Sequence, residues 1–202
     1  MFTVVIQAGG ESRRMGQDKG LLSFLGKPLV ARAVERLAPI ADEVIVTTNR
    51  PQDYEFLGVP LVADRIPGRG ALGGLYTALS AAGHPYVAVV ACDMPFVNPK
   101  LLAAQRDLLV QTQADIVIPH LEGGMEPFHA VYRRQTCLPP IEGALAADKW
   151  RADAWFHRVK VHLMRGEEIA KYDPDLLSFW NVNTPEEMQE ALQIARRLSA
   201  SA

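Results

Sequence analysis

Glycines and cationic side chains crowd the segment that follows the first apolar run of the chain, Phe2 to Ala8. Residues 9–20 read GGESRRMGQDKG and contain four glycines together with Arg13, Arg14 and Lys19. Glycine lets backbone N–H groups turn toward an oxyanion without a Cβ in the way, and the cations add positive charge for a polyphosphate. The segment therefore predicts a phosphate-binding loop. The alternative, a solvated surface turn, requires no such density of glycines and cations.

A lone acid, Asp93, stands directly after the most apolar run of the chain, Tyr86 to Cys92. A buried carboxylate is costly unless it is paired or binds a cation. We expect Mg²⁺, because this ion commonly divides its coordination between a carboxylate and substrate phosphates, which the first loop would bring. In the alternative interpretation, Asp93 caps the turn that follows it. Cys92 is expected to act as a small buried hydrophobe.

Two further glycine patterns resemble phosphate-binding motifs. The P-loop pattern fails at Gly26-Lys27, because five residues separate Gly20 from this pair where the motif has four. The pattern Gly-x-Gly-x-x-Gly occurs at residues 68–73, with Asp93 twenty residues beyond it as a possible ribose-binding acid. Residues 64–67 separate this pattern from the preceding strand, whereas the dinucleotide fingerprint places its turn directly on the strand end. A nicotinamide-dependent dehydrogenase is therefore the less favoured hypothesis.

Apolar runs and helical periodicities alternate along most of the chain. This alternation is typical of βαβ units and predicts a three-layer αβα fold with a Rossmann-like, mostly parallel central sheet, in one domain over residues 1–202. Ligands of such sheets bind beyond the carboxyl ends of the strands, where both candidate loops lie. Strands are expected at Phe2–Ala8, Glu43–Thr48, Pro60–Ala63, Tyr86–Ala91, Asp115–Pro119, Ala130–Tyr132 and Val159–Met164, and helices at Leu29–Leu37, Gly74–Ala82, Pro99–Val110 and from Thr184-Pro185 onward.

The composition excludes several classes of protein. Of the 202 residues, 49% are hydrophobic and 22% are charged, which excludes intrinsic disorder as the main state. A formal net charge of −2 provides no general attraction to nucleic acid or to an anionic membrane. The longest apolar run has seven residues, so no membrane-spanning helix is expected. With no signal-peptide core after Met1, we expect a cytoplasmic protein. Two cysteines are too few for a zinc site.

The first loop also resembles a known signature. The pattern Gln7-Ala8-Gly9-Gly10-x-Ser12-x-Arg14-Met15-Gly16-x-Asp18-Lys19 is similar to the loop of nucleotidyltransferases that join a nucleoside monophosphate to a phosphorylated acceptor. Within that superfamily the chain looks most like the molybdenum cofactor guanylyltransferases. The similarity extends along nearly the whole chain, through Gly26–Leu29, Asn49-Arg50, Asp64, Gly70–Leu75, Cys92–Phe96 and Asn181–Glu186 in the family's order.

The resemblance implies a fold of the nucleotide-diphospho-sugar transferase type and a role for each matching residue. Mg²⁺ would be held by Asp93, and Lys19 and Arg14 would act on the triphosphate as catalytic cations. Asn181 and Asn183 would lie near the acceptor or the metal. The nucleotide-binding residues would be Gln7, Ala8, Gly9, Gly10, Lys19, Thr47, Asn49, Asp64 and Asp93.

The resemblance further implies transfer of GMP from GTP to the terminal phosphate of molybdopterin, with release of pyrophosphate. A chaperone that delivers the cofactor, or a molybdoenzyme that accepts it, is the implied protein partner. Two positions depart from the family's pattern: Gln7 replaces an apolar residue, and Ala71 replaces a common proline. Gly9 favours guanine, because related cytidylyltransferases tend to carry alanine there. A CTP-dependent cytidylyltransferase of the same fold and a nucleotide-binding protein without catalysis are the alternatives.

Overall fold

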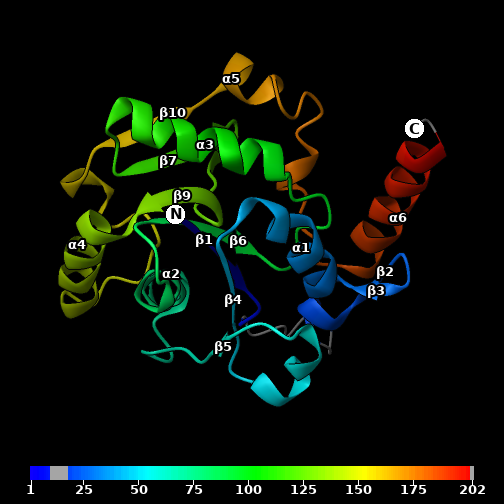
Figure 1. Ribbon diagram of the computed structural model, residues 1–202, viewed down its shortest axis with the longest axis horizontal. Helices are drawn as coiled ribbons and strands as arrows, with labels where there is room; N and C mark the ends of the chain where they lie inside the picture. Colours follow the sequence, from blue (N-terminus) through cyan, green and yellow to red (C-terminus); the bar gives the residue numbers. More distant parts are fainter. Residues whose placement is uncertain (10–17, 201–202) are drawn as a thin grey trace.

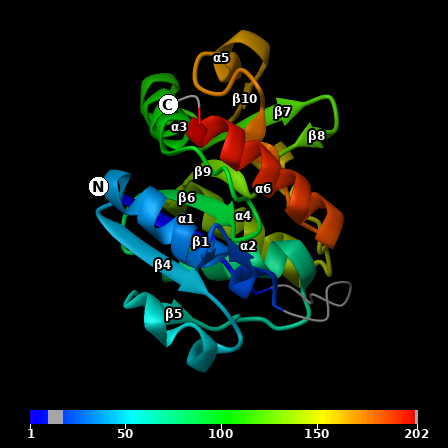
Figure 2. The same cartoon turned by 90° about the vertical axis from the view of Figure 1, so that its right-hand side faces the viewer.

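A computed structural model describes residues 1–9 and 18–200 of the chain (Figure 1). Its centre is a sheet in the order β10-β7-β9-β6-β1-β4-β5, with a short β8 paired to β7. This order can be followed in Figure 2 from β7 and β10 near the top to β5 at the bottom. The strands are β1 (Phe2–Gln7), β4 (Glu43–Thr47), β5 (Leu61–Val62), β6 (Tyr86–Ala91), β7 (Ile116–Leu121), β8 (Gly124–Met125), β9 (His129–Arg133) and β10 (Val161–Met164).

The sheet is mostly parallel, as the alternation of strands and helices predicts. β1 runs parallel to β4 and β6, and Gln7 at its end pairs in register with Thr47 and Ala91. The carboxyl ends of three central strands therefore lie level. Within the described part of this central sheet, only β8 and β9 run antiparallel to their neighbours. β9 follows β7 after only seven residues, too few for the helical crossover that a parallel pair requires.

Helices cover both faces of the sheet and complete the expected three layers. Helices α1 (Leu29–Leu37) and α3 (Pro99–Thr112) share one buried apolar cluster with the sheet, and α2 (Gly70–Ala81) and α4 (Arg134–Ala146) share the other. α2 and α4 lie side by side (Figure 1). The strands have apolar residues facing both layers because both faces are buried. Within the described ranges, no helix has the length and apolar character of a membrane span.

The C-terminal helix returns to the start of the chain. α6 (Pro185–Ala200) packs its buried residues Met188, Ala191 and Ala195 against Phe24 and Leu29, beside the hairpin of β2 (Ser23–Phe24) and β3 (Lys27–Pro28) (Figure 1). A short helix, α5 (Gly166–Ala170), lies between β10 and α6 in the sequence. Because α6 packs there, the residues just before it, such as Val182 and Asn183, lie close to the carboxyl ends of β1 and β6.

Two expectations about helices differ from the structure. α2 begins at Gly70, four residues earlier than expected, because the glycine-rich stretch is itself helical. α4 was not expected at all, since Pro139 and Pro140 lie inside it and proline usually breaks a helix. The helix forms because Cys137, Ile141, Ala144 and Leu145 are buried in the apolar cluster that α4 shares with α2 and the sheet.

Candidate functional site

A cavity of about 880 Å³ opens at the carboxyl ends of β1, β4 and β6. Its volume is in the range that holds a nucleotide-sized ligand. The place agrees with the expectation that ligands bind beyond the strand ends of an open α/β sheet. Its walls come from the residues after each of these strands and from the start of α2: Gln7, Ala8, Gly9, Asp18, Lys19, Thr48–Arg50, Asp64, Ile66–Ala71, Gly74, Ala91–Asp93, Phe128 and Trp150.

Lys19 and Asp93 meet in this cavity. Lys19 begins the 3₁₀ turn η1 (Lys19–Leu21), and its Nζ lies 2.9 Å from Asp93 Oδ2 and 2.6 Å from Asn183 Oδ1. The two charged side chains are only 22% and 16% exposed. The structure thus joins three predicted site residues that are 74 and 164 positions apart in the sequence.

The second oxygen of the Asp93 carboxylate, Oδ1, is buried and has no hydrogen-bond partner among the described residues. No backbone N–H of those residues bonds to this carboxylate, so the alternative in which Asp93 caps the following turn finds no support. A buried carboxylate oxygen without a partner fits a divalent cation. Residues 1–9 and 18–200 contain no cluster of three or more His, Cys, Asp or Glu side chains that could hold a metal alone. Mg²⁺ commonly combines one or two carboxylates with substrate phosphates and water, and Asp93 offers one such carboxylate.

Asn183 is fixed by the start of α6. The Glu187 carboxylate accepts from the backbone N–H groups of Asn183 and Thr184 at 2.5 and 3.0 Å, while Thr184 Oγ1 accepts from the N–H of Glu187 at 3.2 Å. This reciprocal pair is a capping box, as the residues Thr184 to Glu187 predict. The N–H of Val182 donates to the carbonyl of Asp93 at 2.9 Å. Asn181 instead turns its amide to the carbonyl of Phe179, at 3.1 Å.

Asn49 and Asp64 form a second polar pair on the cavity wall. Asn49 Nδ2 donates to Asp64 Oδ2 at 2.7 Å, and the Asp64 N–H donates to Asn49 Oδ1 at 2.9 Å. The pair links the ends of β4 and β5. Thr47 is buried within β4 and holds the N–H of Ala8 through its carbonyl at 2.8 Å. It does not line the cavity; its neighbour Thr48 takes that place.

Gln7 ends β1 and lines the cavity, and its amide lies against Gly74 of α2. A Cβ at Gly74 would lie 3.2 Å from Gln7 Oε1 and 3.3 Å from Nε2, so a larger residue there would press on the amide. Gln7 Nε2 is buried without a hydrogen-bond partner among the described residues. An unpaired buried donor costs free energy until a ligand supplies an acceptor.

The sequence also makes predictions for Gly9, Gly10, Arg14 and Cys92. Gly9 lines the cavity, and a Cβ built on it would lie 4.0 Å from Asp64 Oδ2. Gly10 and Arg14 lie outside the described residues. Cys92 is buried, and burial raises the pKa of its thiol, so it stays protonated as expected of a small hydrophobe.

The structure also disfavours the dehydrogenase hypothesis. Residues 63–69 separate β5 from α2, so the glycine pattern at 68–73 does not form a tight turn on a strand end. Gly70 is instead the first residue of α2. A Rossmann dinucleotide site needs that turn to bring the pyrophosphate onto the helix N-terminus.

Trp150 and Arg69 are among the cavity residues that the sequence did not predict. Trp150 is 51% exposed, and its indole Nε1 donates to Asp148 Oδ1 at 3.2 Å. The Arg69 guanidinium lies 5.8 Å from the centre of the Trp150 ring and also pairs with Asp148. The N–H of Leu72 donates to the Trp150 carbonyl at 3.0 Å, which ties this loop to α2. No periodicity or motif marks the loop.

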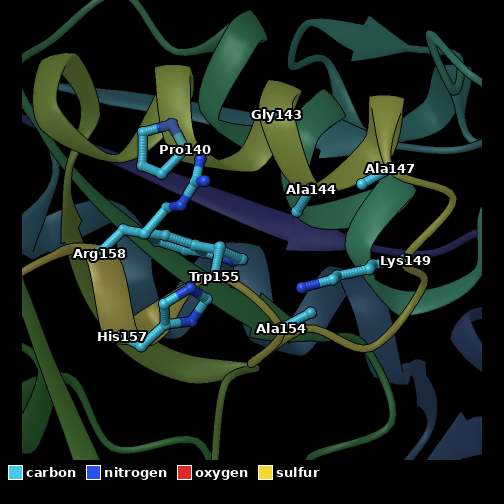
Figure 3. Close-up of a pocket in the computed structure, with 9 residues that line it drawn as sticks. All are labelled: Pro140, Gly143, Ala144, Ala147, Lys149, Ala154, Trp155, His157 and Arg158. Carbon is cyan, nitrogen blue, oxygen red and sulfur yellow. The ribbon is translucent and has the colours of Figure 1, made fainter.

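A second, smaller cavity lies against α4 (Figure 3). Its volume of about 50 Å³ has room for only a few water molecules. Lys149, His157 and Arg158 stand around the fully buried Trp155 there. The large cavity at the strand ends is therefore the candidate active site.

Known proteins resemble this chain along most of its length. Residues 4–161 match the family model of the MobA-like NTP transferase domain. The chain is 34% identical over 192 residues to the molybdenum cofactor guanylyltransferase of Desulfosudis oleivorans, covering 94% of this chain and 93% of the relative. It is 38% identical over 198 residues to the probable molybdenum cofactor guanylyltransferase of Chloroflexus aggregans, covering 94% and 92%.

A solved structure extends the comparison to three dimensions. The molybdopterin-guanine dinucleotide biosynthesis protein A of Archaeoglobus fulgidus superposes with a TM-score of 0.83 at 27% sequence identity. The superposition covers 96% of this chain and 99% of that chain. The mostly parallel three-layer architecture, and with it the predicted fold class, is therefore shared over most of both chains.

Proposed function

The chain belongs to the MobA-like NTP transferase family, and from this we propose that it transfers GMP from GTP to the terminal phosphate of molybdopterin, releasing pyrophosphate. The observation that carries the proposal is the meeting of Lys19 and Asp93 at the strand ends, inside a nucleotide-sized cavity. The relatives named as guanylyltransferases supply the choice of donor and acceptor.

Residues of the chain can meet the chemical requirements of such a transfer. The acceptor phosphate must attack the α-phosphorus in line, and the negative charge of the leaving pyrophosphate must be neutralised. Lys19 supplies the positive charge, and Asn183 and Asp93 orient its ammonium group. Asp93 would hold Mg²⁺ through the oxygen that lacks a partner among the described residues. When bound, Mg²⁺ would act as a Lewis acid on phosphate oxygens.

The other wall of the cavity suits a nucleoside. Asn49 and Asp64 hold each other in place beside the strand ends, and the Gln7 amide offers a donor with no partner in the described part of the chain. A Gln amide carries both a donor and an acceptor. It can therefore meet the edge of guanine or, with the amide turned, that of cytosine. Cytidylyl transfer is thus the second candidate.

Pyrophosphate release by the full chain tests the proposal. We expect release with GTP, Mg²⁺ and molybdopterin together, and none when a chelator removes the metal or when CTP replaces GTP. Preference for CTP would establish cytidylyl transfer, and GTP binding without release would establish a non-catalytic nucleotide-binding protein. The proposal includes a cytosolic location and a chaperone or molybdoenzyme that exchanges the pterin with this site.

Substitution of Lys19 tests whether its positive charge binds the triphosphate. Lys19→Ala is expected to weaken GTP binding and to lower turnover, because the triphosphate loses a partly buried cation. Lys27→Ala is the matched control, since Lys27 pairs with Glu35 on an exposed surface at 2.6 Å. Equal kinetics for the two variants would show that Lys19 takes no part in triphosphate binding.

A further inference from the structure

Tyr54 is a fully buried tyrosine that none of the chemistry above uses. It lies between two 3₁₀ turns, η3 (Pro51–Asp53) and η4 (Glu55–Leu57), in the segment that follows β4. Its side chain is 0% exposed. Its hydroxyl donates to Asp18 Oδ1 at 2.6 Å, across 36 positions of sequence.

Asp18 closes the turn that carries Lys19. The same oxygen, Oδ1, also accepts from the N–H of Gly20 at 3.1 Å, so the carboxylate caps η1. The carbonyl of Asp18 accepts from the N–H of Leu21 at 3.1 Å. Tyr54 and the turn therefore share one carboxylate.

Gly20 shows how closely this turn packs on the phenol. A Cβ at position 20 would lie 2.7 Å from the Tyr54 hydroxyl and 3.3 Å from Cys92 Sγ. The first distance is shorter than a Cβ contact allows, so Gly20 is needed for the turn to reach the phenol. Of the two neighbours of Lys19, Asp18 bonds to the Tyr54 hydroxyl and Gly20 leaves room for it.

We propose that Tyr54 is a positioning residue for Lys19, holding residues 18–20 so that the Lys19 ammonium reaches the phosphate-binding end of the cavity. A lysine side chain is long and flexible, so the point from which it starts decides what its ammonium can reach. From this turn, Lys19 Nζ reaches Asp93 and Asn183 at 2.9 and 2.6 Å. The inference rests on the proposed function, because it takes the ligand of Lys19 to be a triphosphate.

The position of Tyr54 also connects the two walls of the cavity. Its segment begins just after Asn49 and Arg50, which line the nucleoside side, while its hydroxyl holds the phosphate side. Burial and the Asp18 carboxylate raise the pKa of the phenol, so the hydroxyl remains a donor at any working pH. A substitution of Tyr54 should therefore shift the position of the Lys19 ammonium group.

Binding of GTP with Mg²⁺ to the full chain, measured by calorimetry, tests the inference. Tyr54→Phe removes only the hydroxyl and should raise the Kd for GTP roughly tenfold, with kcat/KM for pyrophosphate release falling at least as far. Gly20→Ala should have the same effect, because its methyl group displaces the phenol. Tyr76→Phe is the control, since the Tyr76 hydroxyl meets Glu142 only at 3.4 Å on an exposed surface.

A double-mutant cycle separates positioning from a merely structural role. If Tyr54 acts through Lys19, then Tyr54→Phe should leave the Kd for GTP unchanged in a Lys19→Ala background. Asp18→Asn keeps an acceptor oxygen for the phenol and should bind GTP more tightly than Asp18→Ala. The inference is overturned if Tyr54→Phe binds GTP like wild type, or if its effect is as large without Lys19.

The cycle also distinguishes this inference from the proposed function. If wild type bound GTP but released no pyrophosphate with molybdopterin, the proposed reaction would fail while the cycle on binding could still succeed. If guanylyl transfer were observed and the cycle showed no coupling between Tyr54 and Lys19, only the positioning role would fail.

Discussion

The two oxygens of the Asp93 carboxylate have different surroundings, and this difference predicts the effect of Asp93→Asn. From the sequence alone, removal of an uncompensated buried charge is expected to leave stability unchanged or higher. The structure corrects the premise, because Lys19 pairs with Oδ2 at 2.9 Å. We expect Asp93→Asn to unfold in urea within about 1 kcal/mol of wild type, since the amide keeps an acceptor oxygen for Lys19, which Asn183 also holds.

Activity should respond far more strongly to the same substitution. We expect pyrophosphate release to fall at least about a hundredfold, because an amide holds a metal much more weakly than a carboxylate does. Asp107→Asn is the control, since Asp107 is an exposed acid that pairs with Arg106. Turnover at the wild-type rate in Asp93→Asn would remove Asp93 from the catalytic site.

Gln7→Leu should separate stability from nucleotide binding. Gln7 Nε2 is buried without a partner among the described residues, so its replacement should raise the free energy of unfolding by about 1 kcal/mol. The same change removes the amide from the cavity, and the KM for GTP should rise roughly tenfold with kcat little altered. Urea unfolding and steady-state kinetics measure the two effects. An unchanged KM would show that the amide does not contact the nucleotide.

Residue types at strand ends were enough to find part of the site. Lys19 and Asp93 could be predicted because glycines, cations and a lone acid stand just after apolar runs. Tyr54 and Arg69 could not, because each contacts a partner that is distant in the sequence. The phenol of Tyr54 meets a residue 36 positions away, and Arg69 meets one 79 positions away. No local pattern encodes such contacts.

At the level of elements, the start of α6 connects stability to the site. Glu187 accepts from the N–H groups of Thr184 and Asn183, and the Asn183 side chain accepts from Lys19. Glu187→Ala should cost about 1 kcal/mol of unfolding free energy, the usual loss for a cap. It should also lower kcat/KM, because Asn183 loses the contact that fixes its backbone.

The neighbouring acid provides the comparison for this variant. Glu186 is exposed on the same turn, and Glu186→Ala should change neither urea unfolding nor kinetics appreciably. If Glu187→Ala lost stability but kept full kcat/KM, then Asn183 would not depend on the cap. If both variants behaved alike, the capping box would have no measurable role.

Most elements followed from periodicity, and the exceptions have physical causes. The strand Tyr86–Ala91 and the helix Leu29–Leu37 have the expected bounds, because apolar runs and amphipathic spacing act locally. β9 was expected as a strand, but its antiparallel direction depends on the length of the connection from β7. α4 was missed because burial of one face outweighs two internal prolines.

On the scale of the whole molecule, the path of the chain places a buried polar group beside the site. His129 begins β9, at the same edge of the sheet as Asp93, and is 0% exposed. Its ring lies 5.1 Å from that of Phe179, and neither ring nitrogen has a partner among the described residues. The segment that holds Phe179 continues to Asn183. The packing that buries His129 is thus part of what carries Asn183 to the cavity.

This burial predicts acid lability. Burial lowers the pKa of His129 to about 4, although nearby Asp173 opposes the shift. The unfolded chain, with an ordinary histidine pKa of about 6.5, therefore binds a proton first as the pH falls. The stability that depends on neutral His129 is complete above pH about 6.5 and is lost toward pH about 4, by roughly 2 kcal/mol already at pH about 5.

Urea unfolding of wild type and His129→Phe at neutral and mildly acid pH measures this loss. The variant has no proton to bind at position 129, so it should retain more of its stability on acidification than wild type does. Burial raises the pKa of Glu126, which acts in the opposite direction in both proteins and cancels in the comparison. His157→Phe, at an exposed histidine, should keep the wild-type slope. Parallel slopes for wild type and His129→Phe would show that His129 does not control acid stability, and the loss would then arise elsewhere.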